Sequence, residues 1–142
     1  MSTVVRTFRD LVAWQRGMAL VSQIYKTVGT FPVSESYALS IQLCRAAVSV
    51  PSNIAEGKGR LSKREFIQFL SRARGSLLEV ETQLEIARDL GYIDSKKFDE
   101  VFEFAIRTGK PLNGLIRSVR AQLSVNVIAS PRAKSQEPRA KK

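Results

Sequence analysis

Few residues of this 142-residue chain could carry out catalysis or hold a metal. The chain has no histidine, and its single cysteine, Cys44, lies in an apolar stretch where we expect a small buried side chain. A catalytic thiol would usually need a histidine partner. Glu56 could act as a general acid or base, but nothing in the sequence supplies a second catalytic group. We therefore expect no enzymatic activity, no metal and no cofactor.

Positive charge is the chemical property that this chain has in excess. Its 23 lysine and arginine residues outnumber 13 aspartate and glutamate residues, which gives a formal net charge of +10 and a pI near 10.3. A pI this high is typical of a protein with a nucleic-acid partner. The alternative is that the basic surface only keeps the protein soluble, since charge governs association and not fold.

Two groups of basic side chains are candidate phosphate sites. The turn at residues 58–64 carries four positive charges beside the start of a predicted helix, where outward-pointing amide groups favour anions. A second group recurs on about one face of the last predicted helix. The predicted nucleic-acid-binding residues are Lys58, Arg60, Lys63, Arg64, Arg107, Lys110, Arg117 and Arg120. The alternative for the turn is a solvated loop.

The remaining charged and aromatic residues shape this prediction. An acidic row on the third predicted helix consists of Glu81, Glu85 and Asp89. The charges therefore separate by face, which solubility alone would not require. Aromatic residues fall on apolar stripes and do not alternate with basic ones, so no platform for stacking bases is expected. Binding should depend on phosphate contacts and have weak sequence specificity.

A polar stripe is predicted on the second helix. It consists of Gln42, Arg45, Ser49, Asn53 and Glu56, at intervals of three and four residues. One interpretation is a contact surface for RNA. The other, which we favour because buried polar groups must find partners, is a structural hydrogen-bonded network. In that network Arg45 would pair across a subunit contact and Glu56 would hold the turn at Gly57.

Apolar residues recur at intervals of three and four in four segments, which predicts four amphipathic helices. The first stripe consists of Leu11, Trp14, Met18, Val21, Tyr25 and Val28. The second begins at about residues 34–35 and consists of Leu39, Leu43, Ala46, Val50 and Ile54. The third consists of Leu70, Ala73, Leu77, Val80, Leu84 and Ala87, and the fourth of Phe98, Phe102, Ala105, Gly109, Leu112, Ile116, Val119 and Leu123. Pro51 should kink or interrupt the second helix, and Pro111 should bend the fourth.

Local signals mark the ends of the last two helices. Ser62 and Glu65 have the spacing of a capping box, in which the serine hydroxyl accepts from the Glu65 amide and the glutamate accepts from the serine amide. Gly91 is a natural C-terminal cap, and Asp94 opens the fourth helix. Two hydrophobic staples are predicted, at the pairs Leu61–Phe66 and Ile93–Phe98.

Short connections should make sequential helices antiparallel. The predicted fold is therefore all-α, an up-down-up-down four-helix bundle over residues 8–124. Residues 125–142 lack an apolar face and should form a disordered basic tail. We find no signal peptide and no uninterrupted apolar run long enough to span a membrane, so a cytoplasmic protein is expected.

Surplus apolar residues suggest that the bundle self-associates. Val12, Ile24, Phe104 and Leu115 lie off the predicted stripes. A four-helix bundle needs about one apolar face per helix, so a subunit interface would account for the surplus. The alternative is a broad core face that includes these residues.

Several segments together resemble one protein family. They are Phe8–Gln15, Ile24-Tyr25, Phe31-Pro32, the run from Gln42 to Gly57 with its central RAAVSVPSNIAEG, the elements of Glu65–Glu79, and Leu90–Ile93. Over about residues 8–123 the chain resembles the bacterial four-helix bundle proteins known as 23S rRNA intervening-sequence proteins. That resemblance implies an antiparallel bundle without catalytic activity that forms a ring, typically a homopentamer. Similar proteins are the accessory proteins of diversity-generating retroelements, thought to bind nucleic acid and a reverse transcriptase.

The sequence leaves two functional hypotheses. The first is a non-enzymatic oligomer that binds nucleic acid, RNA above all, through its basic surfaces. The alternative is a structural or adaptor protein that docks an acidic or nucleoprotein partner such as a reverse transcriptase.

Overall fold

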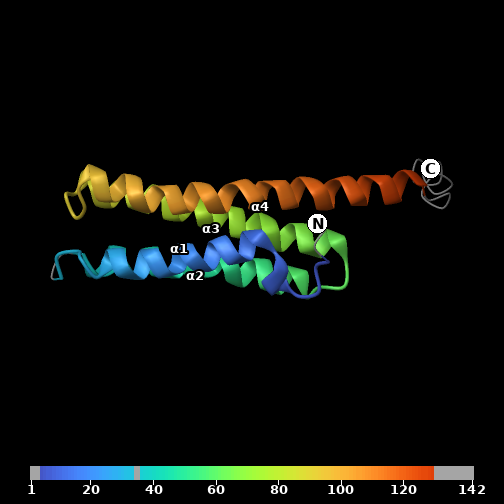
Figure 1. The fold of residues 1–142 in the computed structure, drawn as a ribbon, viewed down its shortest axis with the longest axis horizontal. Coiled ribbons are helices and arrows are strands. Elements are labelled where there is room, and N and C mark those ends of the chain that lie inside the picture. Colours follow the sequence, from blue (N-terminus) through green and yellow to red (C-terminus); the bar gives the residue numbers. More distant parts are fainter. Residues whose placement is uncertain (1–3, 34–35, 130–142) are drawn as a thin grey trace, which may run out of the picture.

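A computed structural model of the chain describes residues 4–33 and 36–129 (Figure 1). A short 3-10 helix, η1 (Phe8–Asp10), precedes four helices: α1 (Val12–Val28), α2 (Tyr37–Lys58), α3 (Lys63–Asp89) and α4 (Ser95–Ala129). Successive helices run in opposite directions, and α1 contacts α4 as well as α2, whereas the diagonal pairs stay apart. The predicted all-α, up-down-up-down bundle is confirmed. Residues 130–142 of the predicted tail lie outside the described residues.

The buried face of α1 differs from the predicted stripe. It consists of Ala13, Gly17, Leu20, Ile24 and Thr27, whereas Met18 and Tyr25 of the predicted stripe are 45% and 54% exposed. The reason is close packing between α1 and α2: a β-carbon at Gly17 would be 3.4 Å from Cβ and Cδ of Pro51. The prediction was wrong for Met18 and Tyr25, whereas Trp14, Val21 and Val28 pack half-buried against the core. The centre of the buried face is shifted toward Gly17, Leu20 and Ile24.

The predicted stripes of the other three helices are buried or, at Leu39, Phe102, Gly109 and Leu123, half-buried. Pro51 and Pro111 both lie inside continuous helices, so neither interrupts its helix. Among the off-stripe residues, Ile24 belongs to the core, and Phe104 and Leu115 pack against it half-buried. The broad-core alternative therefore accounts for these three residues, and Val12, at 51% exposure, remains on the surface.

The start of α3 keeps only part of its predicted capping. The Ser62 hydroxyl accepts a hydrogen bond of 3.1 Å from the Glu65 amide, and it donates one of 3.2 Å to the Glu65 carboxylate. The glutamate thus meets the Ser62 side chain in place of the Ser62 amide. The staple between Leu61 and Phe66 is wrong: Leu61 is fully exposed, because Phe66 packs against α2 beside Gly57.

The connection between α3 and α4 follows its sequence signals. Gly91 has a φ of 77°, and Tyr92 and Gly91 donate backbone hydrogen bonds to the carbonyls of Ala87 and Arg88, which closes α3 in a Schellman motif. Asp94 then accepts a 2.8 Å hydrogen bond from the Lys97 amide. The predicted staple residues Ile93 and Phe98 are both buried.

A capping box that the prediction missed precedes α1. Thr7 caps η1, and Asp10 accepts hydrogen bonds of 2.8 Å and 3.1 Å from the amides of Arg6 and Thr7. These bonds hold the pKa of Asp10 below its ordinary value. The threonine and the acid three residues later are the sequence signal that could have found this cap.

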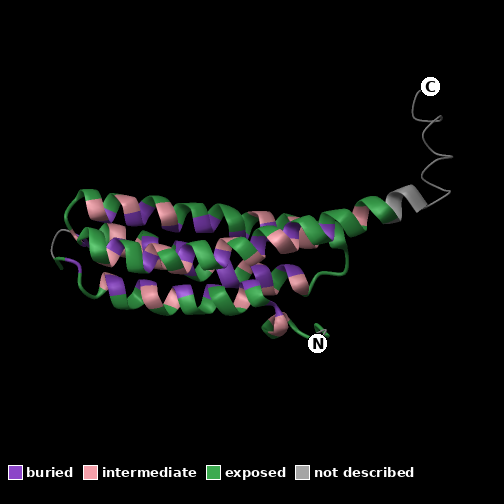
Figure 2. Cartoon of the chain, turned by 45° about the horizontal axis from the view of Figure 1, so that its top comes forward, coloured by how far each residue is buried: buried purple, intermediate pink, exposed green. Residues whose placement is uncertain are grey.

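Helix α4 is longer than the bundle. Its C-terminal part extends past the ends of the other helices (Figure 2). The helix continues to Ala129, so residues 125–129, which the sequence predicted to belong to the disordered tail, are helical. The apolar pattern nevertheless stops near Val125, which is 63% exposed. Neither α4 nor any other helix in the described part of the chain is long and apolar enough to cross a membrane.

Candidate nucleic-acid interface

The structure gathers most of the predicted basic residues at one end of the bundle. The turn between α2 and α3 lies at the same end as the N-terminal segment and the C-terminal half of α4 (Figure 1). Lys63 lines a shallow hollow together with Ala121, Gln122 and Val125 of α4, so the turn and this part of α4 are neighbours. We call this region the basic end. It contains Lys58, Arg60, Lys63, Arg64, Arg117 and Arg120, with Arg6 and Arg9 from the N-terminal segment.

Two predicted residues lie outside the basic end. Arg107 and Lys110 lie nearer the middle of α4, and the Arg107 guanidinium forms a 3.2 Å ion pair with Glu103 one turn earlier. Conversely, Arg6 and Arg9 were not predicted, because only the folded chain brings the N-terminal segment beside the turn. The spacing of basic residues along α4 did not distinguish Arg107 and Lys110 from Arg117 and Arg120, which lie at the basic end.

Arg60 is fixed by contacts with the bundle. Its guanidinium forms a 2.7 Å ion pair with Glu56 and lies 4.6 Å from the centre of the Phe69 ring, where Arg72 also lies at 4.7 Å. The face of an aromatic ring attracts a guanidinium that lies above it. Arg60 therefore helps to hold the turn, and Glu56 takes part in that contact.

Lys63 and Arg64 are the freest cations of the turn. Both are exposed in the first turn of α3 and form no ion pair with any described residue. The nearby amide of Glu65 is already bonded to Ser62. A phosphate at this helix start would therefore contact the charged side chains of Lys63 and Arg64, and not the Glu65 amide.

Acidic residues gather at the opposite end. Eight of the 13 aspartates and glutamates lie between Glu79 and Glu103, in the C-terminal half of α3 and the start of α4. Within this region burial and the neighbouring Glu85 carboxylate raise the pKa of Glu81. Glu85 itself forms a 2.5 Å ion pair with Arg88. The charges are thus separated along the long axis of the bundle, and not only by face.

Part of the predicted polar stripe is a hydrogen-bonded link between α2 and α3. The Asn53 amide donates to the Ser49 carbonyl and hydroxyl, each at 2.8 Å, and the Ser76 hydroxyl of α3 donates to the Ser49 hydroxyl at 2.8 Å. Arg45 and Gln42, one and two turns before Ser49, are exposed and take no part in this link.

Gln42 and Arg45 line a polar groove between α2 and α3. Its volume is about 250 Å³. The lining residues are Gln42, Arg45, Ala46, Ser49, Ser76, Glu79 and Gln83. Sequence reasoning missed Glu79 and Gln83, since only the rotation of α3 in the bundle shows that they face Arg45.

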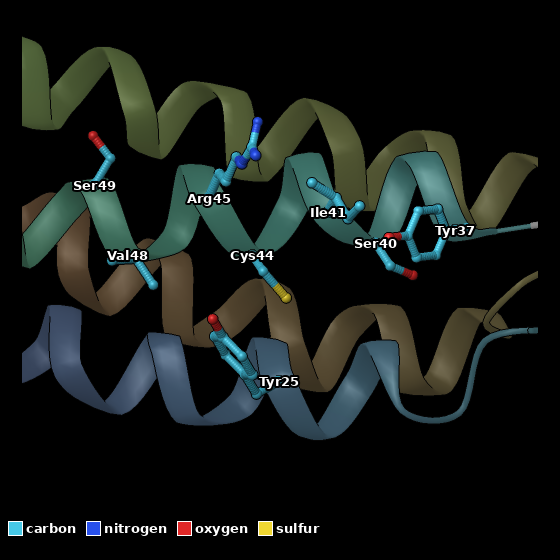
Figure 3. A pocket seen from close by; sticks show the side chains of 8 residues that line it. All are labelled: Tyr25, Tyr37, Ser40, Ile41, Cys44, Arg45, Val48 and Ser49. Atoms are coloured by element: carbon cyan, nitrogen blue, oxygen red, sulfur yellow. The ribbon is translucent and has the colours of Figure 1, made fainter.

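A second, apolar groove runs between α1 and α2 (Figure 3) and has a volume of about 630 Å³. It is lined by Tyr25, Tyr37, Ser40, Ile41, Cys44, Arg45, Val48 and Ser49. Cys44 and Val48 point toward α1, and Tyr25 reaches across from that helix. Partial burial raises the pKa of the Cys44 thiol. Arg45 and Ser49 line both grooves, so the two form one continuous surface.

Neither groove resembles a metal centre. Within residues 4–33 and 36–129, no three histidine, cysteine, aspartate or glutamate side chains come together in a way that could hold a metal ion. The groups that the structure places together are basic side chains at one end and two grooves along the side.

The chain is similar to known proteins in sequence and in fold. A family model described as 23S rRNA-intervening sequence protein matches residues 9–114. The fold is similar to a solved protein of unknown function from the S23 ribosomal protein family of Bacteroides thetaiotaomicron, with a TM-score of 0.66 and 24% identity over 74% of this chain and 98% of that chain. This likeness supports the fold alone. No curated protein matches the chain.

Proposed function

Since the chain belongs to the 23S rRNA-intervening sequence protein family, we propose that it is a non-enzymatic, self-associating protein whose basic end binds nucleic acid, RNA above all. The observation that carries the proposal is the separation of charge along the bundle. Basic side chains from three separate segments meet at one end, while eight acidic residues lie toward the other. A solubilising surface would not need this arrangement.

The chemistry of the basic end favours phosphate over bases. Phe69 and Phe98 are buried, and Phe66 and Phe102 pack partly buried against the core, so these rings are not available for stacking. Each phosphate neutralised by a lysine or arginine releases condensed counterions, which makes affinity fall steeply with salt. We therefore expect similar affinities for unrelated sequences.

Self-association is supported by the apolar groove between α1 and α2. Tyr25, Tyr37 and Val48 along it are 54%, 71% and 40% exposed, and bulky apolar surface gathered in one place favours a contact with another protein surface. The proposed assembly is a ring, a homopentamer by the resemblance to the family. A ring presents several basic ends at once, so that weak contacts act together on one polyanion.

Filter binding with RNA and with DNA of unrelated sequences tests the proposal. The expected result is binding at low ionic strength that weakens steeply as salt is added. Binding that does not change with salt, or no binding at low ionic strength, would contradict it. In the adaptor hypothesis the same basic end docks an acidic partner such as a reverse transcriptase. That hypothesis expects no binding to RNA or DNA, even at low ionic strength.

A further inference from the structure

A buried polar atom in the groove between α2 and α3 lacks a partner. Gln83 is only 9% exposed, and its side-chain oxygen accepts no hydrogen bond from any described residue. An unsatisfied buried acceptor is costly, and such groups are rare in native structures. The oxygen itself is buried, but the side chain lines the polar groove, so a turn of the amide toward the groove would offer this oxygen to a donor that enters it.

The charged residues of the same groove are unpaired as well. Arg45 extends from α2 on the side of α3 (Figure 3), and Glu79 lies on α3 one turn before Gln83. Among the described residues neither Arg45 nor Glu79 forms an ion pair. Residues four apart on a helix share a face, so Glu79 and Gln83 supply two acceptor groups on the same side of the groove. A guanidinium, with several donors in one plane, is suited to bond two such acceptors.

The chain itself carries the complement to this acceptor pair. Arg45 is an exposed guanidinium without a partner at the junction of the polar and apolar grooves. An apolar groove flanked by charged polar groups has the composition of a protein interface, with an apolar centre and a polar rim. Phosphate is a poor occupant, since the Glu79 carboxylate would repel it. The complementary charges favour a second copy of this chain.

We propose that Arg45 of one copy enters the polar groove of a neighbouring copy and donates hydrogen bonds to the neighbour's Glu79 and Gln83. The inference rests on the self-association in the proposed function and specifies its contact. An arginine that bonds to both acceptors fixes the relative orientation of the two copies and also contributes affinity, because a planar guanidinium can reach both acceptors in only one orientation.

Charge reversal with mixing tests this contact. Arg45→Glu and Glu79→Arg each place like charges in the contact, so each variant alone should have the mass of a 15.8 kDa monomer by light scattering. An equimolar mixture of the two should recover associated species, because each unlike pair of copies restores an attraction. Arg74→Glu is the matched control: it makes the same charge change on an exposed residue of α3 that lines neither groove, and it should stay associated.

The double variant Arg45→Glu/Glu79→Arg separates a contact between copies from one within a chain. Restored mass in both the double variant and the mixture supports the proposal. Restoration in the double variant without restoration in the mixture would place the pair within one chain and overturn it. Single variants that remain associated would also overturn it, while leaving the proposed self-association intact. A wild-type monomer would overturn both, and circular dichroism confirms that each variant is folded.

Discussion

Gly57 of α2 lies directly against Phe69 of α3: a β-carbon at position 57 would be 2.7 Å from Cβ of Phe69. The Phe69 ring in turn lies under the guanidinium groups of Arg60 and Arg72. The close approach of the two helices therefore sets the position of the turn between them, and with it the cations of the basic end.

Replacing Gly57 by alanine should destabilise the bundle. The added methyl group would have to displace Phe69 and Phe66, and overpacking of this kind costs about 1–3 kcal/mol. Gly75 is the matched control, since a β-carbon there meets nothing within 4 Å. Gly75→Ala should stabilise α3 by up to about 1 kcal/mol through helix propensity. Urea denaturation measures the free energy of unfolding of both variants. A change in the same direction for Gly57→Ala and Gly75→Ala would contradict the close packing at Gly57.

Ser62→Ala should lower the free energy of unfolding by about 1 kcal/mol, because the Glu65 amide loses its acceptor at the N-cap of α3. Ser52→Ala, at an exposed position inside α2, serves as the control and should change stability little. Thermal melts of the two variants beside the wild type measure the difference. Equal melting temperatures for Ser62→Ala and the wild type would show that the cap contributes nothing.

Glu81→Gln should stabilise the protein at neutral pH. Burial and the Glu85 carboxylate raise the pKa of Glu81 in the folded state, so the folded chain binds its proton more tightly than the unfolded chain does. Stability contributed by the protonated form is present below the unfolded pKa and is lost as pH rises through the folded pKa. The advantage of Glu81→Gln in melting temperature should therefore be present at pH 7 and disappear in acid. An advantage that stayed constant across this pH range would contradict the raised pKa.

The Cys44 thiol should report on assembly. Its raised pKa lowers the thiolate fraction at neutral pH, and in the proposed assembly a second copy covers the apolar groove. Alkylation by a maleimide should be slow in the wild type and faster in the dissociated Arg45→Glu variant. The rate for Arg74→Glu should match the wild type, and equal rates for all three proteins would argue against a covered groove.

The fold was predictable because three of the four helices bury long, regular stripes of bulky residues. The exact buried face of α1 was not, because Ala13 and Gly17 are too small to dominate a periodicity argument, and Gly17 is buried by its fit against Pro51. The predicted staple between Leu61 and Phe66 has the right spacing, but Phe66 packs against α2 beside Gly57 and leaves Leu61 exposed.

The candidate sites depended on three-dimensional information to different degrees. The charges of Lys63 and Arg64 could be identified from the turn sequence alone. Their grouping with Arg6 and Arg117, and the exclusion of Arg107 by its ion pair with Glu103, required the up-down topology and side-chain geometry. The groove that joins Arg45 to Gln83 depends on the rotation of two helices about their axes, which a sequence stripe does not specify.

The most direct test of the central claim compares two double charge reversals. Lys63→Glu/Arg64→Glu changes the first turn of α3 at the basic end, and Lys96→Glu/Lys97→Glu makes the same charge change in the first turn of α4 at the acidic end. Both pairs follow a capped helix start, at Ser62 and Asp94, so both variants should keep the fold. Filter binding to RNA across a salt series should show a large loss of affinity and a shallower salt dependence for Lys63→Glu/Arg64→Glu alone. Equal losses for the two variants would show that net charge, and not the basic end, binds the nucleic acid.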